Sequence, residues 1–203
     1  MKFDKIKSLC KKKKHIVIYN DYRNNVQWIS DGVCMFPMYN MPKMNEDNIF
    51  AVFDIAIDDR SKYYCDISDE MPPDIDVGDI FDDEKAAERI GLSIGFAGEV
   101  LIPIATEYGA VFINSKYLDV CSDIEEKQLY LRMKNHNVPY IAIKDGFVLL
   151  GIVLPMKVIG DIFNDKFRKL TVMTQTAQHN RFCVADREEN HDDDEQTDMT
   201  EDL

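Results

Sequence analysis

The chain opens with apolar residues at helical spacing. Phe3, Ile6, Leu9 and Cys10 recur at intervals of three and four positions, and lysines fill the positions around them. This pattern gives a helix one apolar stripe that packs on a core. We expect a short amphipathic helix that ends within residues 11–14.

Three strand-like runs follow in the first half. Residues 15–19 are mostly β-branched or aromatic, and residues 26–30 and 33–38 flank Asp31 and Gly32. An Asp-Gly pair between two such runs is a strong signal for a tight β-hairpin. The first half is therefore expected to run helix, strand, strand, strand.

The second half repeats this order. Ser115 fits the N-cap of a short helix over residues 116–121, and the last two strand-like runs flank another Asp-Gly turn at residues 144–146. The strand-like runs of this half are residues 92–94, 100–104, 110–113, 129–133, 140–143 and 147–154.

Both halves also end their last strand alike, with Phe-Pro-Met at residues 36–38 and Leu-Pro-Met at residues 154–156. We interpret this as a weak internal repeat of a β-α-β-β-β unit. Chance is the alternative, because Asp-Gly and Pro are common at turns and strand ends. The expected fold class is α+β, with two such repeats forming an antiparallel sheet.

The segments outside the repeat have their own patterns. Ile49, Phe50, Val52 and Phe53 predict a short buried element, and residues 84–90 predict a second helix closed by Gly91. The acidic stretch 66–83, which contains prolines, is expected to be a surface loop. Val158, Ile162, Phe163, Phe167 and Leu170 predict a C-terminal helix. The domain is expected to span residues 1–178, with a disordered acidic tail over 179–203.

Charge is distributed unevenly along the chain. The 203 residues contain 24 Lys and Arg against 37 Asp and Glu, a net charge of -13. Residues 1–14 carry +6, whereas an acidic insertion over about residues 54–89 and the end of the chain, residues 186–203, carry -9 each. The rest is nearly neutral, so the acidic total hides a basic first helix.

Composition excludes several classes of protein. No run approaches the roughly 18 apolar residues of a membrane span, and no signal-peptide pattern follows Met1. We therefore expect a soluble, cytoplasmic protein with no membrane partner. The 5 cysteines are scattered and include no Cys-x-x-Cys pair. This spacing argues against a disulfide framework and against a structural zinc site.

Catalytic motifs are absent as well. Gly91, Gly95 and Gly98 lack the Lys-Ser/Thr of a phosphate loop, and no nucleophile elbow or His-Glu-x-x-His helix occurs. Paired carboxylates lie in polar surroundings that would not tune them for acid-base work. We expect a protein that is not an enzyme and that needs no cofactor or metal.

Two charged segments are candidate binding surfaces. We expect the clustered lysines of the first helix to face no acidic partner. They are either a solvated helix face or a surface for DNA phosphates. The acidic insertion either serves solubility or imitates nucleic acid toward a basic groove of a nuclease. The lysines are Lys5, Lys7, Lys11, Lys12 and Lys13, and the acids are Asp58, Asp59, Asp74, Asp76, Asp79, Asp82, Asp83 and Glu84.

One part of the chain resembles a known family. Residues 111–118, followed by 129–133, 140–146 and 153–156, resemble the end of a domain of the bacterial replicative sliding clamp, the DNA polymerase β subunit. In that family a similar Phe-Asn-x-Lys-Tyr-Leu opens the helix, and Met-Pro-Met closes the final strand. The resemblance implies a β-α-β-β-β repeat whose helices face DNA, which adds Lys116 to the DNA-facing lysines, although Asp119 and Asp123 oppose it.

The resemblance implies a non-enzymatic, clamp-like accessory protein of DNA replication or processing, with DNA or a DNA-processing protein as partner. The bacterial clamp uses three domains per chain, so a single domain would need about six copies to close a similar ring. The short length and the acidic segments also resemble accessory proteins of bacteriophages or mobile elements. The alternative function is an acidic inhibitor of a host DNA-targeting nuclease, of the anti-restriction or anti-CRISPR type.

Overall fold

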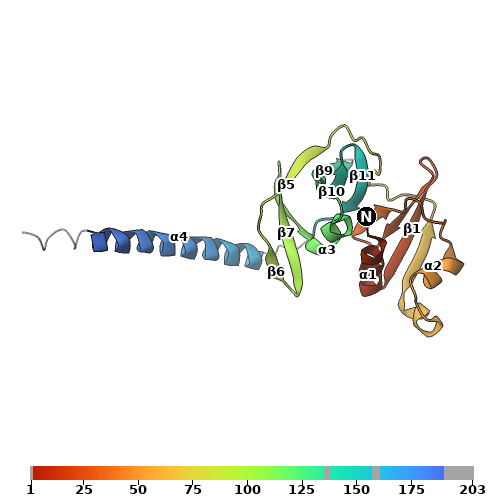
Figure 1. Ribbon diagram of the computed structural model, residues 1–203, viewed down its shortest axis with the longest axis horizontal. Helices are drawn as coiled ribbons and strands as arrows, with labels where there is room; N and C mark the ends of the chain where they lie inside the picture. Colours follow the sequence, from red (N-terminus) through yellow and green to blue (C-terminus); the bar gives the residue numbers. More distant parts are fainter. Residues whose placement is uncertain (1, 135–137, 157–160, 190–203) are drawn as a thin grey trace, which may run out of the picture. The chain divides into compact units, whose positions relative to one another are not determined.

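The computed structural model of the chain describes residues 2–134, 138–156 and 161–189. It divides the chain into two units, Met1–Lys157 and Val158–Leu203. The first unit holds a large, mostly antiparallel β-sheet with short helices, and the described part of the second is one long helix (Figure 1). The protein is therefore a mixed α+β protein, as the sequence predicts.

The first half of the sheet follows the predicted order. α1 (Phe3–Lys13) ends at Lys14, whose positive φ of 54° is a left-handed helix cap, and the chain turns directly into β1 (His15–Asp21). β2 (Val26–Ser30) and β3 (Cys34–Pro37) then pair antiparallel, which confirms the first Asp-Gly hairpin.

The second half also follows the predicted order, with one local correction. Its short helix is capped by Asn114, whose side chain accepts a hydrogen bond from the backbone N–H of Lys116, and not by Ser115. Asn114 has the extended backbone that an N-cap requires, so the helix begins one residue early. The elements are β7 (Glu99–Thr106), β8 (Gly109–Asn114), α3 (Ser115–Leu118), the 3-10 helix η2 (Asp119–Cys121), β9 (Gln128–Lys134), β10 (Val138–Asp145) and β11 (Val148–Val153).

The segment between the halves departs from the prediction. The helix predicted over residues 84–90 is instead a strand, β5 (Lys85–Arg89), because its backbone pairs with β9. This pairing overrides the helix preference of Lys, Ala and Glu. A strand that the sequence did not indicate, β4, lies beside β1 in parallel. The remaining elements are α2 (Glu46–Val52), which is the predicted short buried element, η1 (Ile57–Lys62), β4 (Tyr64–Ser68) and β6 (Ile94–Phe96).

The two halves meet in the middle of the sheet. The strand order is β4-β1-β2-β3-β11-β10-β9-β5-β7-β6, with β8 paired to β7, and the described pairs other than β1 with β4 are antiparallel. At the join, β3 and β11 pair through Met35↔Ile152 and Cys34↔Val153. A β-carbon on Gly151 would meet Phe36 Cε1 at 2.5 Å, so the join requires a residue without a side chain at this position.

Side chains alternate between the two faces of the sheet and form two cores. On one face, Ile29, Phe36 and Ile141 pack with α1, α2 and α3. On the other face, Trp28 and Tyr140 pack beneath Met71, Ile75 and Val77. The acidic stretch 66–83 is thus not a simple surface loop, because its apolar residues cover the second face of the sheet.

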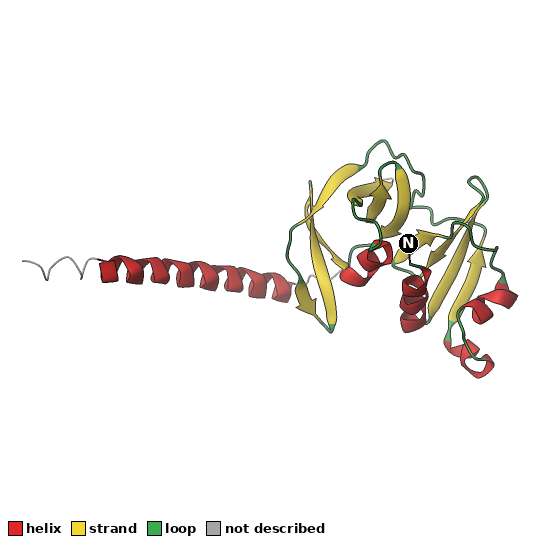
Figure 2. Cartoon of the chain, in the orientation of Figure 1, coloured by secondary structure: helices red, strands yellow, loops and turns green. Residues whose placement is uncertain are grey.

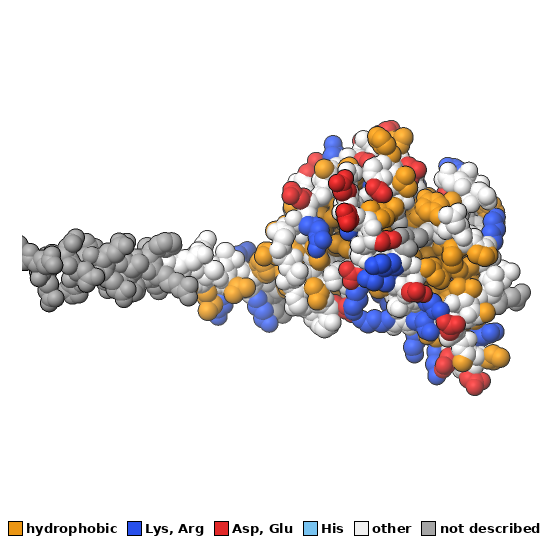
Figure 3. Space-filling model, viewed as in Figure 1, with side chains coloured by type: hydrophobic (Ala, Val, Ile, Leu, Met, Phe, Trp, Pro, Cys, Tyr) orange, Lys and Arg blue, Asp and Glu red, His pale blue; other side chains and the backbone are white. Residues whose placement is uncertain are grey.

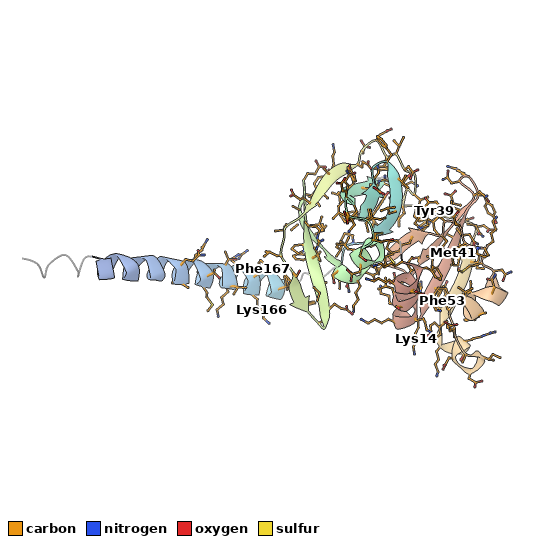
Figure 4. The ribbon with its side chains drawn as sticks, viewed as in Figure 1. Lys14, Tyr39, Met41, Phe53, Lys166 and Phe167 are labelled. Atoms are coloured by element: carbon orange, nitrogen blue, oxygen red, sulfur yellow. The ribbon has the colours of Figure 1, made fainter. Side chains whose placement is uncertain are left out.

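The second unit contains the predicted C-terminal helix, α4 (Asp161–Glu189). Phe163 and Phe167 stack one turn apart along it, with ring centroids 5.8 Å apart, and Phe167 is labelled in Figure 4. The expected domain boundary after residue 178 falls within this helix, which includes residues 179–189 of the expected tail. The sequence of residues 179–189 contains few apolar residues, but its Ala, Arg and Glu residues favour a helix. Residues 190–203 and Val158 lie outside the described residues.

Among the described helices, none is both long and apolar enough to cross a membrane.

Candidate nucleic-acid interface

Two helices that are far apart in sequence lie together on one face of the sheet. α1 buries Ile6, Leu9 and Cys10, and α3 buries Tyr117 and Leu118, in the same core. The start of the chain also bonds to η2, since the backbone N–H of Lys2 donates to the carbonyl of Val120 at 2.9 Å. The two helices are drawn on the same side of the strands in Figure 2. The predicted lysines of both helices therefore share one surface.

Glu99 links the two sets of lysines. Lys116 Nζ lies 2.6 Å from Glu99 Oε2, Lys12 forms an ion pair with the other carboxylate oxygen, and Asn114 Nδ2 donates to Glu99 Oε2 at 3.0 Å. Hydrogen bonds from Lys116, Lys12 and Asn114 lower the pKa of Glu99 to about 2. Glu99 is therefore charged at any ordinary pH, and it holds Lys12 and Lys116 side by side.

Asp31 anchors the opposite end of this surface. Its Oδ2 accepts a hydrogen bond from the Tyr117 hydroxyl at 2.9 Å and lies 3.4 Å from Lys13 Nζ. Its Oδ1 accepts the backbone N–H groups of Val33 and Cys34. Burial alone would raise the pKa of Asp31, but the charge of Lys13 and these hydrogen bonds lower it. The turn residue predicted from the Asp-Gly pair thus also joins the first half to α3.

The remaining predicted lysines are less constrained. Lys7 forms an ion pair with Asp54, and Lys11 Nζ lies 3.4 Å from the Asp54 carbonyl oxygen. Lys5 is half-buried and has no ion-pair partner among the described residues. The expectation that the lysines of the first helix face no acidic partner is therefore wrong for Lys7, Lys12 and Lys13. Figure 3 shows basic side chains gathered over the region of α1, with carboxylates among them.

The acidic candidates divide into two groups. Glu84 is not a surface acid: its side chain is 17% exposed, and Arg132 and Lys144, which pair with it, are 0% and 5% exposed. Arg132 Nη2 lies 2.6 Å from Glu84 Oε2, and Lys144 Nζ lies 2.7 Å from Oε1. Burial would raise the pKa of Glu84, but the hydrogen bonds from Lys144 and Arg132 and their charges lower it.

Arg132 also holds the acidic loop, residues 66–83, on the second face of the sheet. Its Nη1 donates to the carbonyl of Gly78 at 2.7 Å, and Nη2 donates to the carbonyl of Asp79 at 3.2 Å. The Tyr140 hydroxyl accepts the backbone N–H of Asp76 at 3.0 Å, and the backbone N–H of Leu149 donates to Asp79 Oδ1 at 2.7 Å. The backbone of Asp76 and the side chain of Asp79 therefore help to anchor the loop, and the carboxylate of Asp79 remains exposed.

The other acidic candidates lie nearer the surface. Asp58, Asp82 and Asp83 are exposed, and Asp74 is half-buried. Asp59 is paired with Lys62, with Nζ and Oδ1 2.6 Å apart. Of the eight predicted acids, Glu84 is therefore the one whose carboxylate pairs with buried basic residues within the described part of the chain.

The sequence analysis missed Arg132, Tyr140 and Lys144. A signal was present, because alternation along β9 and β10 puts these side chains on the same face, opposite Leu131, Ile141 and Ile143. The sequence analysis assigned no partner to the two basic residues of that face. The acidic stretch far away in the sequence supplies the partner.

The buried thiols offer no nucleophile. Burial, with the nearby Asp31 charge adding to it, raises the pKa of Cys10 to about 12 and that of Cys34 well above its ordinary value. Both therefore remain protonated at neutral pH. Within the described residues, no three His, Cys, Asp or Glu side chains are grouped as metal ligands.

Comparison with protein-family models, with curated proteins and with solved structures gave no match.

Proposed function

We propose that the protein is a non-enzymatic, clamp-like accessory factor of DNA replication or processing, encoded by a phage or mobile element. The surface that contacts DNA is the basic face, defined as Lys5, Lys7, Lys11, Lys12, Lys13 and Lys116. Its ligand is the phosphate backbone, since lysine side chains offer charge without reading base edges.

The arrangement of the two halves carries this proposal. Each half places a helix before a three-stranded antiparallel meander, and the last strands of the two meanders, β3 and β11, pair antiparallel. Antiparallel pairing of equivalent strands relates two units by an approximate two-fold axis, which brings α1 and α3 onto one face. This supports the interpretation of the chain as two β-α-β-β-β-like repeats with their helices toward DNA.

The charge of the basic face favours weak binding. Its six lysines lie beside three carboxylates, Asp31, Asp54 and Glu99, so a net charge of about +3 is left for phosphates. Each phosphate contact adds about 0.9 to the slope of log affinity against log salt concentration. We expect a slope of about 3 for log affinity against log salt concentration, and the same affinity for DNA of any sequence.

A salt titration with labelled duplex DNA tests the proposal. Replacing Lys5, Lys11 and Lys12 with Gln should flatten the slope by up to about 3, because three phosphate contacts are lost. The matched control replaces Lys43, Lys62 and Lys85, which lie on other elements, and should leave most of the slope intact. Absence of DNA binding by the unmodified protein at low salt would overturn the proposal, and solution mass with and without DNA would test for a closed ring.

The second candidate function, inhibition of a DNA-targeting nuclease, has one favourable observation. Arg132 holds the acidic loop in place through Gly78 and Glu84, so Asp82 and Asp83 are presented from a fixed segment. In this case free DNA is not bound, and replacing Asp82 and Asp83 with Asn weakens inhibition of a restriction or CRISPR nuclease. Unchanged inhibition by that variant would exclude this surface.

A further inference from the structure

A cavity of about 450 Å³ opens where the acidic loop crosses the sheet, on the face opposite α1 and α3. Cavities of roughly 300–1,000 Å³ are typical of ligand sites in proteins. Its walls come from the β1–β2 turn, β2, the segment after β3 and the loop. They include Asp21, Val26, Trp28, Tyr39, Val77 and Asp79. Tyr39 is labelled in Figure 4.

The walls of the cavity carry negative charge. Within the part of the chain that the structure describes, the Asp21 carboxylate accepts hydrogen bonds from Arg23 and Asn24 in the turn that follows it, and Asp79 accepts one from the backbone of Leu149. Among the described residues, no cation forms an ion pair with either carboxylate. Burial raises the pKa of Tyr39, and the charges of Asp79 and Asp21, which line the same cavity, raise it further.

The other walls are aromatic and aliphatic. Tyr39 is 45% exposed, while Trp28 is 3% exposed and its indole N–H has no acceptor within the described residues. Aromatic faces attract cations, and the aliphatic walls suit the apolar stem of a long basic side chain.

We propose that this cavity binds a lysine or arginine side chain from a segment of a partner protein. The charged head lies beside Asp21 and Asp79, and the stem packs on Val26, Val77 and the ring of Tyr39. The surrounding residues 54–89 carry a charge of -9, which favours a segment with several basic residues over an isolated amine. The site is independent of the basic face and leaves that face free.

The chain supplies its own reporter for a test, because Trp28 is its single tryptophan. A capped peptide with three lysines is titrated while Trp28 fluorescence is followed, in parallel with the same peptide carrying glutamines and with lysine amide. We expect a saturable change with the lysine peptide, none with the glutamine peptide, and at least tenfold weaker binding of lysine amide. Equal affinity for lysine amide and the peptide would overturn the assignment to a protein segment.

Two variants that remove the same charge separate the cavity from the general acidity of the chain. Replacing Asp21 and Asp79 with Asn keeps their carbonyl acceptors for the backbone and should weaken peptide binding at least tenfold. Replacing the exposed Asp82 and Asp83, which do not line the cavity, should weaken it less than twofold. Equal weakening by both variants, or no saturable binding by the unmodified protein, would overturn the proposal. Near-UV circular dichroism checks that both variants are folded.

Discussion

Both faces of the sheet carry ion pairs between basic residues and Glu, but the pairs differ in how far they are exposed to solvent. On the basic face, Lys12 and Glu99 are paired with 57% and 23% of their side chains exposed. Under the acidic loop, Arg132 and Glu84 are paired with 0% and 17% exposed. Water screens the first pair and is largely excluded from the second. Ion pairs on the basic face can therefore open for a ligand, whereas the buried network has to stay closed for the loop to remain on the sheet.

This difference corrects a common interpretation of charged runs. A run of acids or lysines suggests binding to another molecule. Glu84 instead forms ion pairs within its own chain, and some of the α1 lysines, such as Lys13, also form ion pairs within it. Burial of the partner, and not the density of charge along the sequence, decides which residues are free for function. The following tests address the two faces in order of expected effect.

Glu84→Gln should have the largest effect. The change keeps the shape of the side chain but leaves the buried charges of Arg132 and Lys144 without a counter-charge, which costs about 3–5 kcal/mol when one partner of a buried pair is removed. Urea denaturation should report this loss in the free energy of unfolding. Asp83→Asn, an exposed neighbour with the same change in charge, is the control and should unfold like the unmodified protein. Equal effects at both positions would mean that the network does not hold the loop.

The pH dependence of stability should identify the same network. The folded pKa of Glu84 is lowered, so its stabilisation is complete above the unfolded value of about 4.3 and is lost as the pH falls through the folded pKa. We expect the difference in unfolding free energy between the unmodified protein and Glu84→Gln to be constant near neutral pH and to narrow below about 4.3. Denaturant titrations of both proteins at several pH values measure it. A difference that does not change with pH would assign the effect to a lost hydrogen-bond acceptor and not to the charge of Glu84.

Tyr117→Phe tests a buried hydrogen bond beneath the basic face. It removes the hydroxyl that donates to Asp31 and leaves one buried carboxylate oxygen without this hydrogen bond. Loss of a buried partner costs about 1–3 kcal/mol. Thermal unfolding should record the change, and DNA binding by the basic face should persist. Tyr108→Phe, at an exposed turn, provides the comparison with an unchanged melting temperature.

Lys7→Gln should have the smallest effect on stability. Its partner Asp54 is 76% exposed, and ion pairs of this kind rarely contribute a measurable amount. The melting temperature should stay the same at low and high salt. A clear drop in melting temperature at low salt would show that ion pairs of the basic face stabilise the fold as the buried network does. The contrast between the two faces would then be lost.

Local patterns predicted most of the sheet. Both Asp-Gly hairpins, the strands around them and α1 follow from side chains within a few positions of one another. The errors lie where long-range pairing decides: β5 is a strand because β9 is next to it, and β4 because β1 is. Neither partner is visible in the local sequence, and the Ala and Glu of β5 favour a helix when considered alone.

The candidate site was predictable to a smaller degree. The lysines of α1 and Lys116 could be proposed from a run of charge and a resemblance, and the structure brings Lys12 and Lys116 together at Glu99. Their carboxylate partners come from β7, from the segment after α2 and from the Asp-Gly turn, so only the fold reveals how much charge is left. Trp28 and Tyr39 meet in one cavity for the same reason.

The join between β3 and β11 also bears on how fast the chain folds. Met35 and Ile152, which pair there, are more than a hundred positions apart, whereas the hairpins on either side close over a few residues. Closing a long loop has an entropic cost, and folding slows as contacts become less local. We therefore expect two meanders to form early and to meet late. Because Gly151 has no side chain, the Phe36 ring can pack directly on its backbone when the two meanders pair.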